Sequence, residues 1–115
     1  MTKQEKMQEL RVFAEQIRLE TLKIIGARGF GHVGGSMSLA ETMAVVYGAY
    51  MNIDPKNPRW EDRDWFVLSK GHAGPVMYAT LGLKGFYPVS DAYQLNQPGT
   101  IFPSHTDRNK TPGVD

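Results

Sequence analysis

The stretch Trp65-Phe66-Val67-Leu68-Ser69-Lys70-Gly71-His72 decides the fold, because a short apolar run leads directly into a glycine turn that carries a histidine. An uninterrupted apolar run of this length is typical of a parallel strand covered on both faces. From about Pro75 to Gly85 the sequence predicts a helix, since proline suits the first helical turn and glycine ends helices. A strand followed by a helix predicts an α/β fold, a parallel sheet with helices on both faces.

The rest of the chain is mostly helical in pattern and contains no second clear strand. Apolar residues recur with helical spacing from about Gln4 to Ala27, which predicts one amphipathic helix. The glycine-rich residues 29–37 predict a loop, because fixing so many glycines in regular structure costs entropy. Ser38 and Glu41 have the spacing of a capping box, which predicts a second helix that ends before Asp54-Pro55.

A single strand leaves unpaired backbone groups on both edges, and a stable sheet needs further strands. Residues 97–115 carry repeated Pro-Gly, Asn and Asp signals and predict a long irregular tail. Such a tail inside a compact domain indicates an incomplete unit. We therefore expect residues 1–115 to be the front part of a larger α/β unit or one chain of an assembly.

Composition excludes several classes of protein. The 115 residues, with 41% hydrophobic and 22% charged residues, fit one small globular domain. A net charge of +1 disfavours binding to nucleic acid or to an anionic membrane through a basic patch. Without cysteine there is no disulfide, thiolate nucleophile or Cys-based zinc site. The N-terminus lacks the apolar core of a signal peptide, so we expect a soluble, cytoplasmic protein.

All three histidines lie in turn-like stretches beside glycine, serine or proline. They are His32 in Gly31-His32-Val33-Gly34, His72 after the apolar run, and His105 in Pro103-Ser104-His105-Thr106. Loops on a rigid scaffold are where binding and catalytic groups concentrate, although each histidine alone could simply lie on a surface loop. His72 should project at the carboxyl end of the sheet, where open α/β folds bind ligands, and Gly71 and Gly74 would let a ligand approach the backbone.

Two other interpretations of these motifs are weaker. Gly29-Phe30-Gly31-His32-Val33-Gly34 matches the dinucleotide fingerprint GxGxxG, but no strand pattern precedes it, which leaves at most a weak anion site at the following helix. Three histidines can hold zinc, but these are far apart in sequence and form no short pair such as HxxxH. The acidic residues Glu61, Asp62 and Asp64 are better explained as a solvated loop.

Taken in order, these motifs resemble the N-terminal part of the transketolases. The matching stretches are Gly31-His32-Val33-Gly34, Asp62 to His72, Met77 to Phe86, Ser104-His105-Thr106-Asp107 and Thr111-Pro112-Gly113-Val114-Asp115. Three departures are Val33 for the usual proline, Lys70 for asparagine, and Thr106-Asp107 for Pro-Glu. They make the chain most similar to the N-terminal, diphosphate-binding subunit of the two-chain transketolases.

The resemblance implies transfer of a two-carbon ketol unit between sugar phosphates, with thiamine diphosphate and Mg²⁺ as cofactors. It implies that His32 and His105 approach the donor hydroxyls and that His72 lies near the cofactor, where it moves protons or stabilises charge. His72, Gly35 and Gly71 are the cofactor-binding residues that we expect. No metal ligand is expected in this chain, because the family's GDG motif, with its later asparagine, does not occur in it.

The family's catalytic glutamate belongs to the second half of the enzyme, so the resemblance also implies a partner. We expect this chain alone to bind thiamine diphosphate weakly or not at all, and to become active with a C-terminal transketolase half or subunit in a homo- or hetero-oligomer. One alternative is the front part of another thiamine-diphosphate enzyme, similar to a deoxyxylulose phosphate synthase. Another is a non-catalytic interaction module, in which the histidines are incidental.

Overall fold

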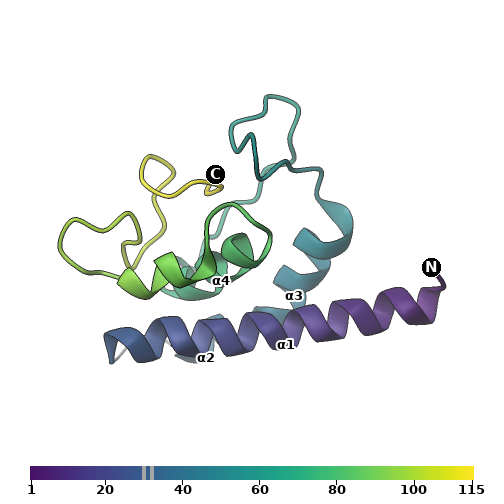
Figure 1. The fold of residues 1–115 in the computed structure, drawn as a ribbon, viewed down its shortest axis with the longest axis horizontal. Coiled ribbons are helices and arrows are strands. Elements are labelled where there is room, and N and C mark those ends of the chain that lie inside the picture. Colours follow the sequence, from purple (N-terminus) through teal and green to yellow (C-terminus); the bar gives the residue numbers. More distant parts are fainter. Residues whose placement is uncertain (30, 32) are drawn as a thin grey trace.

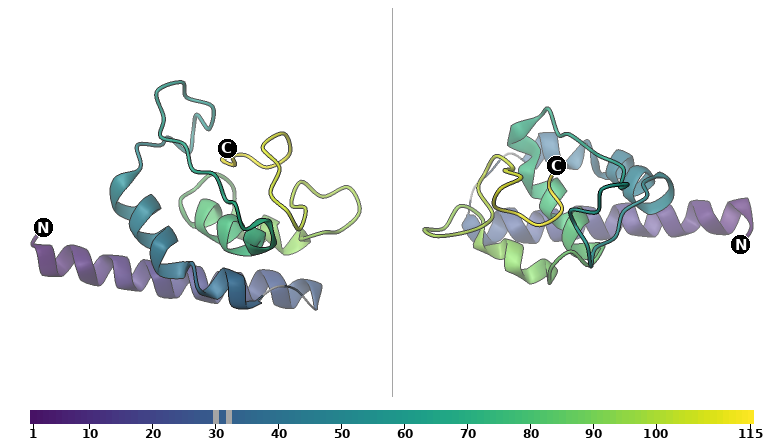
Figure 2. Two further views of the ribbon diagram at one scale, coloured as in Figure 1. Left: turned by 180° about the vertical axis from the view of Figure 1, so that it is seen from behind. Right: turned by 90° about the horizontal axis from the view of Figure 1, so that it is seen from above.

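One long helix, α1 (Lys3–Arg28), runs the length of the protein and carries the other elements on one side (Figure 1). The computed structural model describes residues 1–29, 31 and 33–115. The elements that follow α1 are α2 (Val33–Met37), α3 (Ala40–Val45), the π-helical turn η1 (Val46–Tyr50), the 3-10 turn η2 (Gly71–Ala73), α4 (Gly74–Leu83) and the 3-10 helix η3 (Val89–Gln94). Viewed from behind, α4 lies between α1 and a layer of irregular loops (Figure 2).

The apolar spacing that predicted the first helix is confirmed, to within one residue at each end. Its buried side is formed by Ala14, Ile17, Thr21, Ile24 and Ile25. The Thr2 side chain accepts a hydrogen bond from the backbone N–H of Glu5 at 3.0 Å and caps the first turn. At the other end Gly29 adopts the left-handed conformation, with φ of 93°, that glycine adopts without strain.

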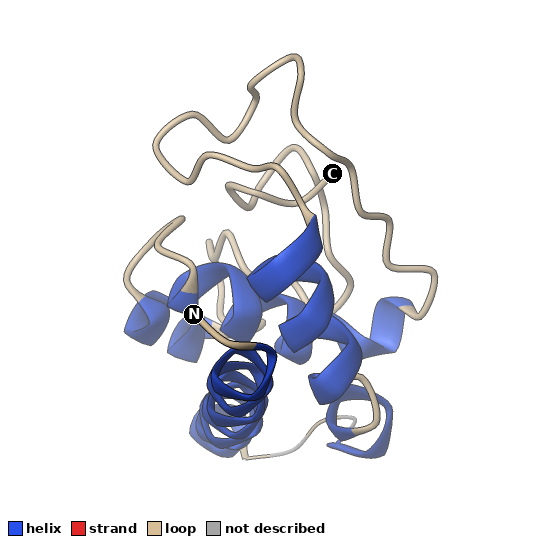
Figure 3. Cartoon of the chain, turned by 90° about the vertical axis from the view of Figure 1, so that its right-hand side faces the viewer, coloured by secondary structure: helices blue, strands red, loops and turns tan. Residues whose placement is uncertain are grey.

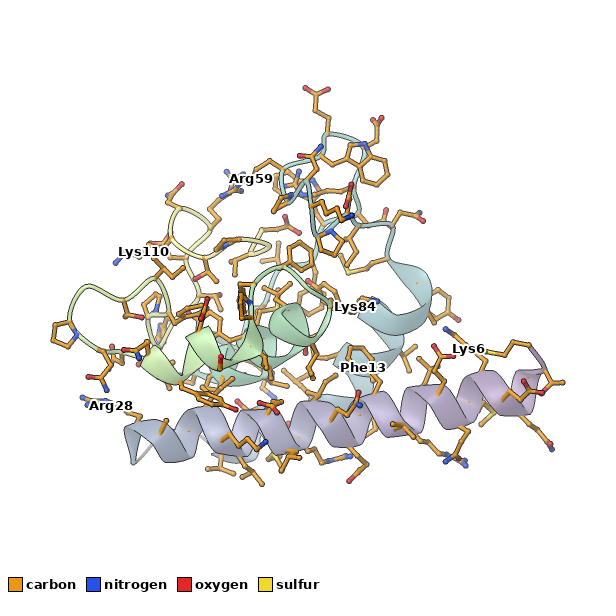
Figure 4. All side chains as sticks on the ribbon, viewed as in Figure 1. Lys6, Phe13, Arg28, Arg59, Lys84 and Lys110 are labelled. Carbon is orange, nitrogen blue, oxygen red and sulfur yellow. The ribbon has the colours of Figure 1, made fainter. Side chains whose placement is uncertain are left out.

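Helix α4 confirms the prediction from Pro75 and Gly85, and it is the most buried element of the fold. Residues 74–82 are all buried, because α1 covers one side and the loops after α4 cover the other. Gly85, with φ of 96°, follows the helix end. Just after α4, Lys84 contacts α1, because its ammonium lies 5.9 Å from the ring centroid of Phe13 (Figure 4).

The predicted α/β class is wrong for the described residues, which form helices and loops and no strand (Figure 3). The run at 65–68 is extended, with Trp65 and Val67 exposed and Phe66 and Leu68 half-buried. A strand is defined by its ladder of hydrogen bonds, and no other segment in the described part of the chain pairs with this one. The apolar run therefore produced an extended conformation without a sheet, and only one of its faces is covered.

Two further predictions fail near the second helix. Residues 33–37 form the short helix α2 where a loop was predicted. The capping box is absent, because the Ser38 hydroxyl donates to the Gly35 carbonyl at 3.0 Å and Glu41 pairs with Arg18 of α1. The second helix also changes to the π-helical turn η1, whose Gly48 carbonyl accepts from Lys6 at 3.1 Å (Figure 4).

No helix among the described residues is long and apolar enough to cross a lipid bilayer.

Candidate functional site

Two of the three predicted site histidines lie in contact. His72 belongs to η2, directly before α4, and His105 belongs to the loop that follows Phe102. Their ring centroids are 4.5 Å apart and their planes meet at 83°, an edge-to-face arrangement. Both residues are exposed, so one ligand can reach both imidazoles. His32, the third predicted histidine, lies outside the described residues.

Gly71 allows this contact by having no side chain. A Cβ atom at Gly71 would lie 3.1 Å from Nδ1 of His105, closer than most carbon contacts in proteins. An alanine at this position would therefore require the His105 ring to shift by a few tenths of an ångström. Within this chain, the predicted site residue Gly71 contributes space for a neighbouring imidazole.

The loop that carries His105 is anchored on α4 by buried aromatic residues. Phe102 is buried between Tyr78 and Tyr87, with ring centroids 5.3 and 5.0 Å away. The Tyr78 hydroxyl donates to the Pro103 carbonyl, and burial raises the pKa of Tyr78 so that it keeps this proton. His105 is thus held two residues beyond a fixed point of the backbone.

Gly74, the first residue of α4, allows the loop that carries His105 to pack against this helix. We expect Gly74→Ala to separate the loop from the helix. A Cβ there would overlap the backbone carbonyl oxygen of Ser104. Gly74 has ordinary helical dihedrals, φ −46° and ψ −45°, so only this overlap opposes alanine. Overpacking of this kind lowers the free energy of unfolding by about 1–3 kcal/mol, measurable by denaturant titration. Displacement of His105 should appear as shifts of its imidazole NMR signals.

Gly26→Ala is the matched control for that experiment. Among the described residues, nothing apart from the helix's own backbone lies within 4 Å of a Cβ built on Gly26, which sits inside α1. Alanine there should stabilise the helix by about 0.5–1 kcal/mol, because glycine loses more backbone entropy on folding. Equal stability changes in the two variants would contradict the proposed overlap at Ser104.

The predicted cofactor residue Gly35 lies in α2, and a lysine joins it to the His72 turn. The Lys70 ammonium is 3.4 Å from the Gly35 carbonyl oxygen and 3.2 Å from the Ser38 hydroxyl oxygen. Among the described residues, a Cβ on Gly35 would meet only Lys70 Cε, at 3.9 Å. Sequence reasoning noted Lys70 only as a departure from the family pattern and did not predict this link.

A groove of about 460 Å³ extends from His105 toward the extended segment. Its lining includes residues 66–68 of the extended segment and residues 105–108 of the His105 loop. Its position next to His105 gives this edge of the site room for a ligand or for further polypeptide.

The described residues contain no metal centre. Within residues 1–29, 31 and 33–115, no three histidine or acidic side chains gather closely enough to hold a metal ion. The acidic residues near Asp64 are exposed on their loop, where the Asp64 carboxylate accepts a hydrogen bond from the Asn52 backbone N–H at 2.7 Å. That contact supports the interpretation of these residues as a solvated loop.

Residues 10–115 match the family described as "Transketolase, thiamine diphosphate binding domain". The chain belongs to the transketolase family. Among curated transketolases, it is 53% identical over 102 residues to a 6-deoxy-6-sulfo-D-fructose transketolase subunit of Clostridium sp. (strain MSTE9), covering 89% of this chain and 37% of that subunit. It is 37% identical over 107 residues to the transketolase of Treponema pallidum, covering 92% of this chain and 16% of that protein.

Solved transketolases share the fold of this transketolase-family chain. The transketolase from Leishmania mexicana matches with a TM-score of 0.85 at 34% identity, and the match covers 91% of this chain and 16% of that structure. A transketolase from Pichia stipitis in complex with sedoheptulose 7-phosphate matches with a TM-score of 0.84, also at 34% identity and with the same coverage. The chain thus spans well under half the length of the transketolases it matches.

Proposed function

We propose that residues 1–115 are part of the diphosphate-side domain of a two-chain transketolase, which transfers a two-carbon ketol unit between sugar phosphates. Family membership supports the enzyme class, and the subunit of Clostridium sp. at 53% identity supports a two-chain enzyme. The observation that carries the proposal within the chain is the contact between His72 and His105, 4.5 Å between ring centroids. This contact supports the proposal because two exposed imidazoles lie together, and an imidazole can accept or donate a proton near neutral pH.

Thiamine diphosphate, when bound, supplies the carbanion chemistry that breaks the carbon–carbon bond. The described residues fit one side of such a site. The imidazoles of His72 and His105 lie together at an exposed position, and among the described residues only Lys70 Cε comes within 4 Å of a Cβ built on Gly35. No three histidine or acidic side chains of the described residues gather closely enough to hold Mg²⁺, and we propose that the metal ligands lie outside this chain.

In this proposal each site residue has a separate role. His72, with Gly71 and Gly35, lies toward the cofactor and holds or moves a proton there. His105 and His32 face the donor hydroxyls, which they orient by hydrogen bonds. The chain's own contribution is orientation and proton transfer, and the partner half would complete the other wall of the site.

We propose an anionic ketose as the donor, with either a phosphate or a sulfonate at carbon 6. The name of the Clostridium subunit includes 6-deoxy-6-sulfo-D-fructose, which supports the sulfonate. The test offers fructose 6-phosphate and its 6-sulfo analogue in turn to the complete enzyme, together with an aldose phosphate that accepts the two-carbon unit, and identifies both products by mass spectrometry. Loss of two carbons from either ketose is the expected result, and products of any other reaction class would contradict the proposal.

We further propose that residues 1–115 form only part of the domain, since the extended segment at 65–68 has one face exposed. Calorimetric titration with thiamine diphosphate and Mg²⁺ should give no measurable binding to this chain alone. Adding the polypeptide that supplies the remaining transketolase length should restore binding. Micromolar affinity of the chain by itself would contradict the proposal that other residues hold the diphosphate.

A further inference from the structure

Lys70 connects two segments of the site that are far apart in sequence. Its ammonium donates to the Gly35 carbonyl and to the Ser38 hydroxyl, which are 35 and 32 residues away. The Ser38 hydroxyl in turn donates to the Gly35 carbonyl at 3.0 Å. The three groups therefore form one polar cluster between α2 and the turn that carries His72.

The charge of Lys70 is directed to neutral oxygens. In residues 1–29, 31 and 33–115, no carboxylate lies within ion-pair distance of its ammonium. A charged donor makes stronger hydrogen bonds than a neutral one.

The segment that Lys70 holds has little stability of its own. Helix α2 spans five residues, Val33–Met37, and two of them are glycines. A helix this short is unstable in isolation, and glycine weakens it further. Its position depends on contacts from other elements, and Lys70 supplies one that is cationic.

We infer that Lys70 is a positioning residue, which holds Gly35 and Ser38 against the turn that carries His72. In this way it fixes residues 33–38 beside the cofactor. The statement about the cofactor rests on the proposed function. The link between Lys70 and residues 33–38, which we call the tether, rests only on the contacts of Lys70. Lys70 is not required to touch substrate or cofactor in order to act in this way.

Amide hydrogen exchange of the complete, cofactor-free enzyme tests the tether. Lys70→Met keeps the stem and removes the charge, and we expect about fivefold faster exchange over residues 33–38, the effect of losing one net hydrogen bond. Lys70→Arg should restore slow exchange. Lys110→Met, which removes an exposed lysine from the loop beyond His105, should leave exchange unchanged.

Ser38→Ala is a second variant for the case in which Lys70→Met speeds amide exchange throughout the protein. This variant deletes one acceptor of Lys70 and should speed exchange over the same residues. Unchanged exchange over residues 33–38 in Lys70→Met would overturn the inference. Faster exchange throughout the protein in Lys70→Met, with no effect of Ser38→Ala, would also overturn it.

Thiamine diphosphate binding provides the second measurement. Lys70→Met should raise the dissociation constant about fivefold and leave kcat at saturating cofactor within about twofold, because the tether sets position and not chemistry. Faster exchange combined with unchanged cofactor affinity would overturn the cofactor part of the inference. Failure of the wild-type enzyme to bind thiamine diphosphate would instead contradict the proposed function.

Discussion

His105→Ala and His72→Ala are each expected to lower the kcat/KM of the complete enzyme by about 10²–10⁴-fold, the usual contribution of a general acid or base. Both imidazoles are exposed and in edge-to-face contact, so each can reach the same bound molecule. Steady-state assays of ketol transfer provide the measurement. Because the rings touch, the double variant should lose less activity than the product of the two single losses.

Asn109→Ala is the matched control for the histidine variants. Asn109 is exposed on the same loop as His105. Its backbone N–H donates a hydrogen bond to the Asp107 carboxylate, a contact that alanine would keep. The unfolding temperatures of the two single histidine variants, the double variant and Asn109→Ala should all lie within a few degrees of the wild type. A loss of activity at unchanged stability then reflects catalysis and not folding. Full activity in both single histidine variants, at unchanged stability, would favour the non-catalytic interaction module.

Asp115→Asn is expected to lower the free energy of unfolding by about 3–5 kcal/mol, the effect of breaking a buried ion pair by removing one partner. One Asp115 oxygen accepts from Arg63 Nε at 3.0 Å, and the other accepts from the Phe66 backbone N–H at 3.0 Å. The side chains of Arg63 and Asp115 are only 7% and 5% exposed. Asparagine would leave the Arg63 charge buried without its carboxylate.

Glu9→Gln provides the comparison for Asp115→Asn, because the Lys6–Glu9 pair is exposed on α1. Its loss should change the free energy of unfolding by less than about 1 kcal/mol, as for other surface ion pairs. Urea titrations of both variants give the two values. A loss below 1 kcal/mol for Asp115→Asn would show that the Arg63 pair contributes no more than a surface pair.

The elements that could be predicted from sequence are those fixed by local chemistry. Helix α1 follows from its apolar period, and α4 follows from Pro75 and Gly85. The strand at 65–68 could not be decided in the same way, because a strand requires a partner segment and the apolar run contains no information about one. The capping box failed because Ser38 and Glu41 found other partners, Gly35 and Arg18.

The sequence predicts candidate site residues, and it does not predict how they lie in space. Histidines in glycine-rich turns identified His72 and His105, but their contact depends on Phe102, Gly71 and Gly74, which bring the later loop against α4. Lys70 was missed because its hydrogen-bond acceptors lie more than thirty residues earlier in the chain. Spacing along the sequence indicates which residues are candidates, and long-range packing decides which of them meet.

The extended segment at 65–68 also bears on how the protein behaves at high concentration. Trp65 and Val67 are 56% and 72% exposed, and in the described part of the chain no hydrogen bond reaches the backbone of Val67 or Leu68. An apolar, unpaired backbone edge is a template for pairing with another copy and hence for aggregation. Co-expression with a chain that covers this edge should therefore improve the yield of dispersed protein, since the covered edge is no longer available for self-association.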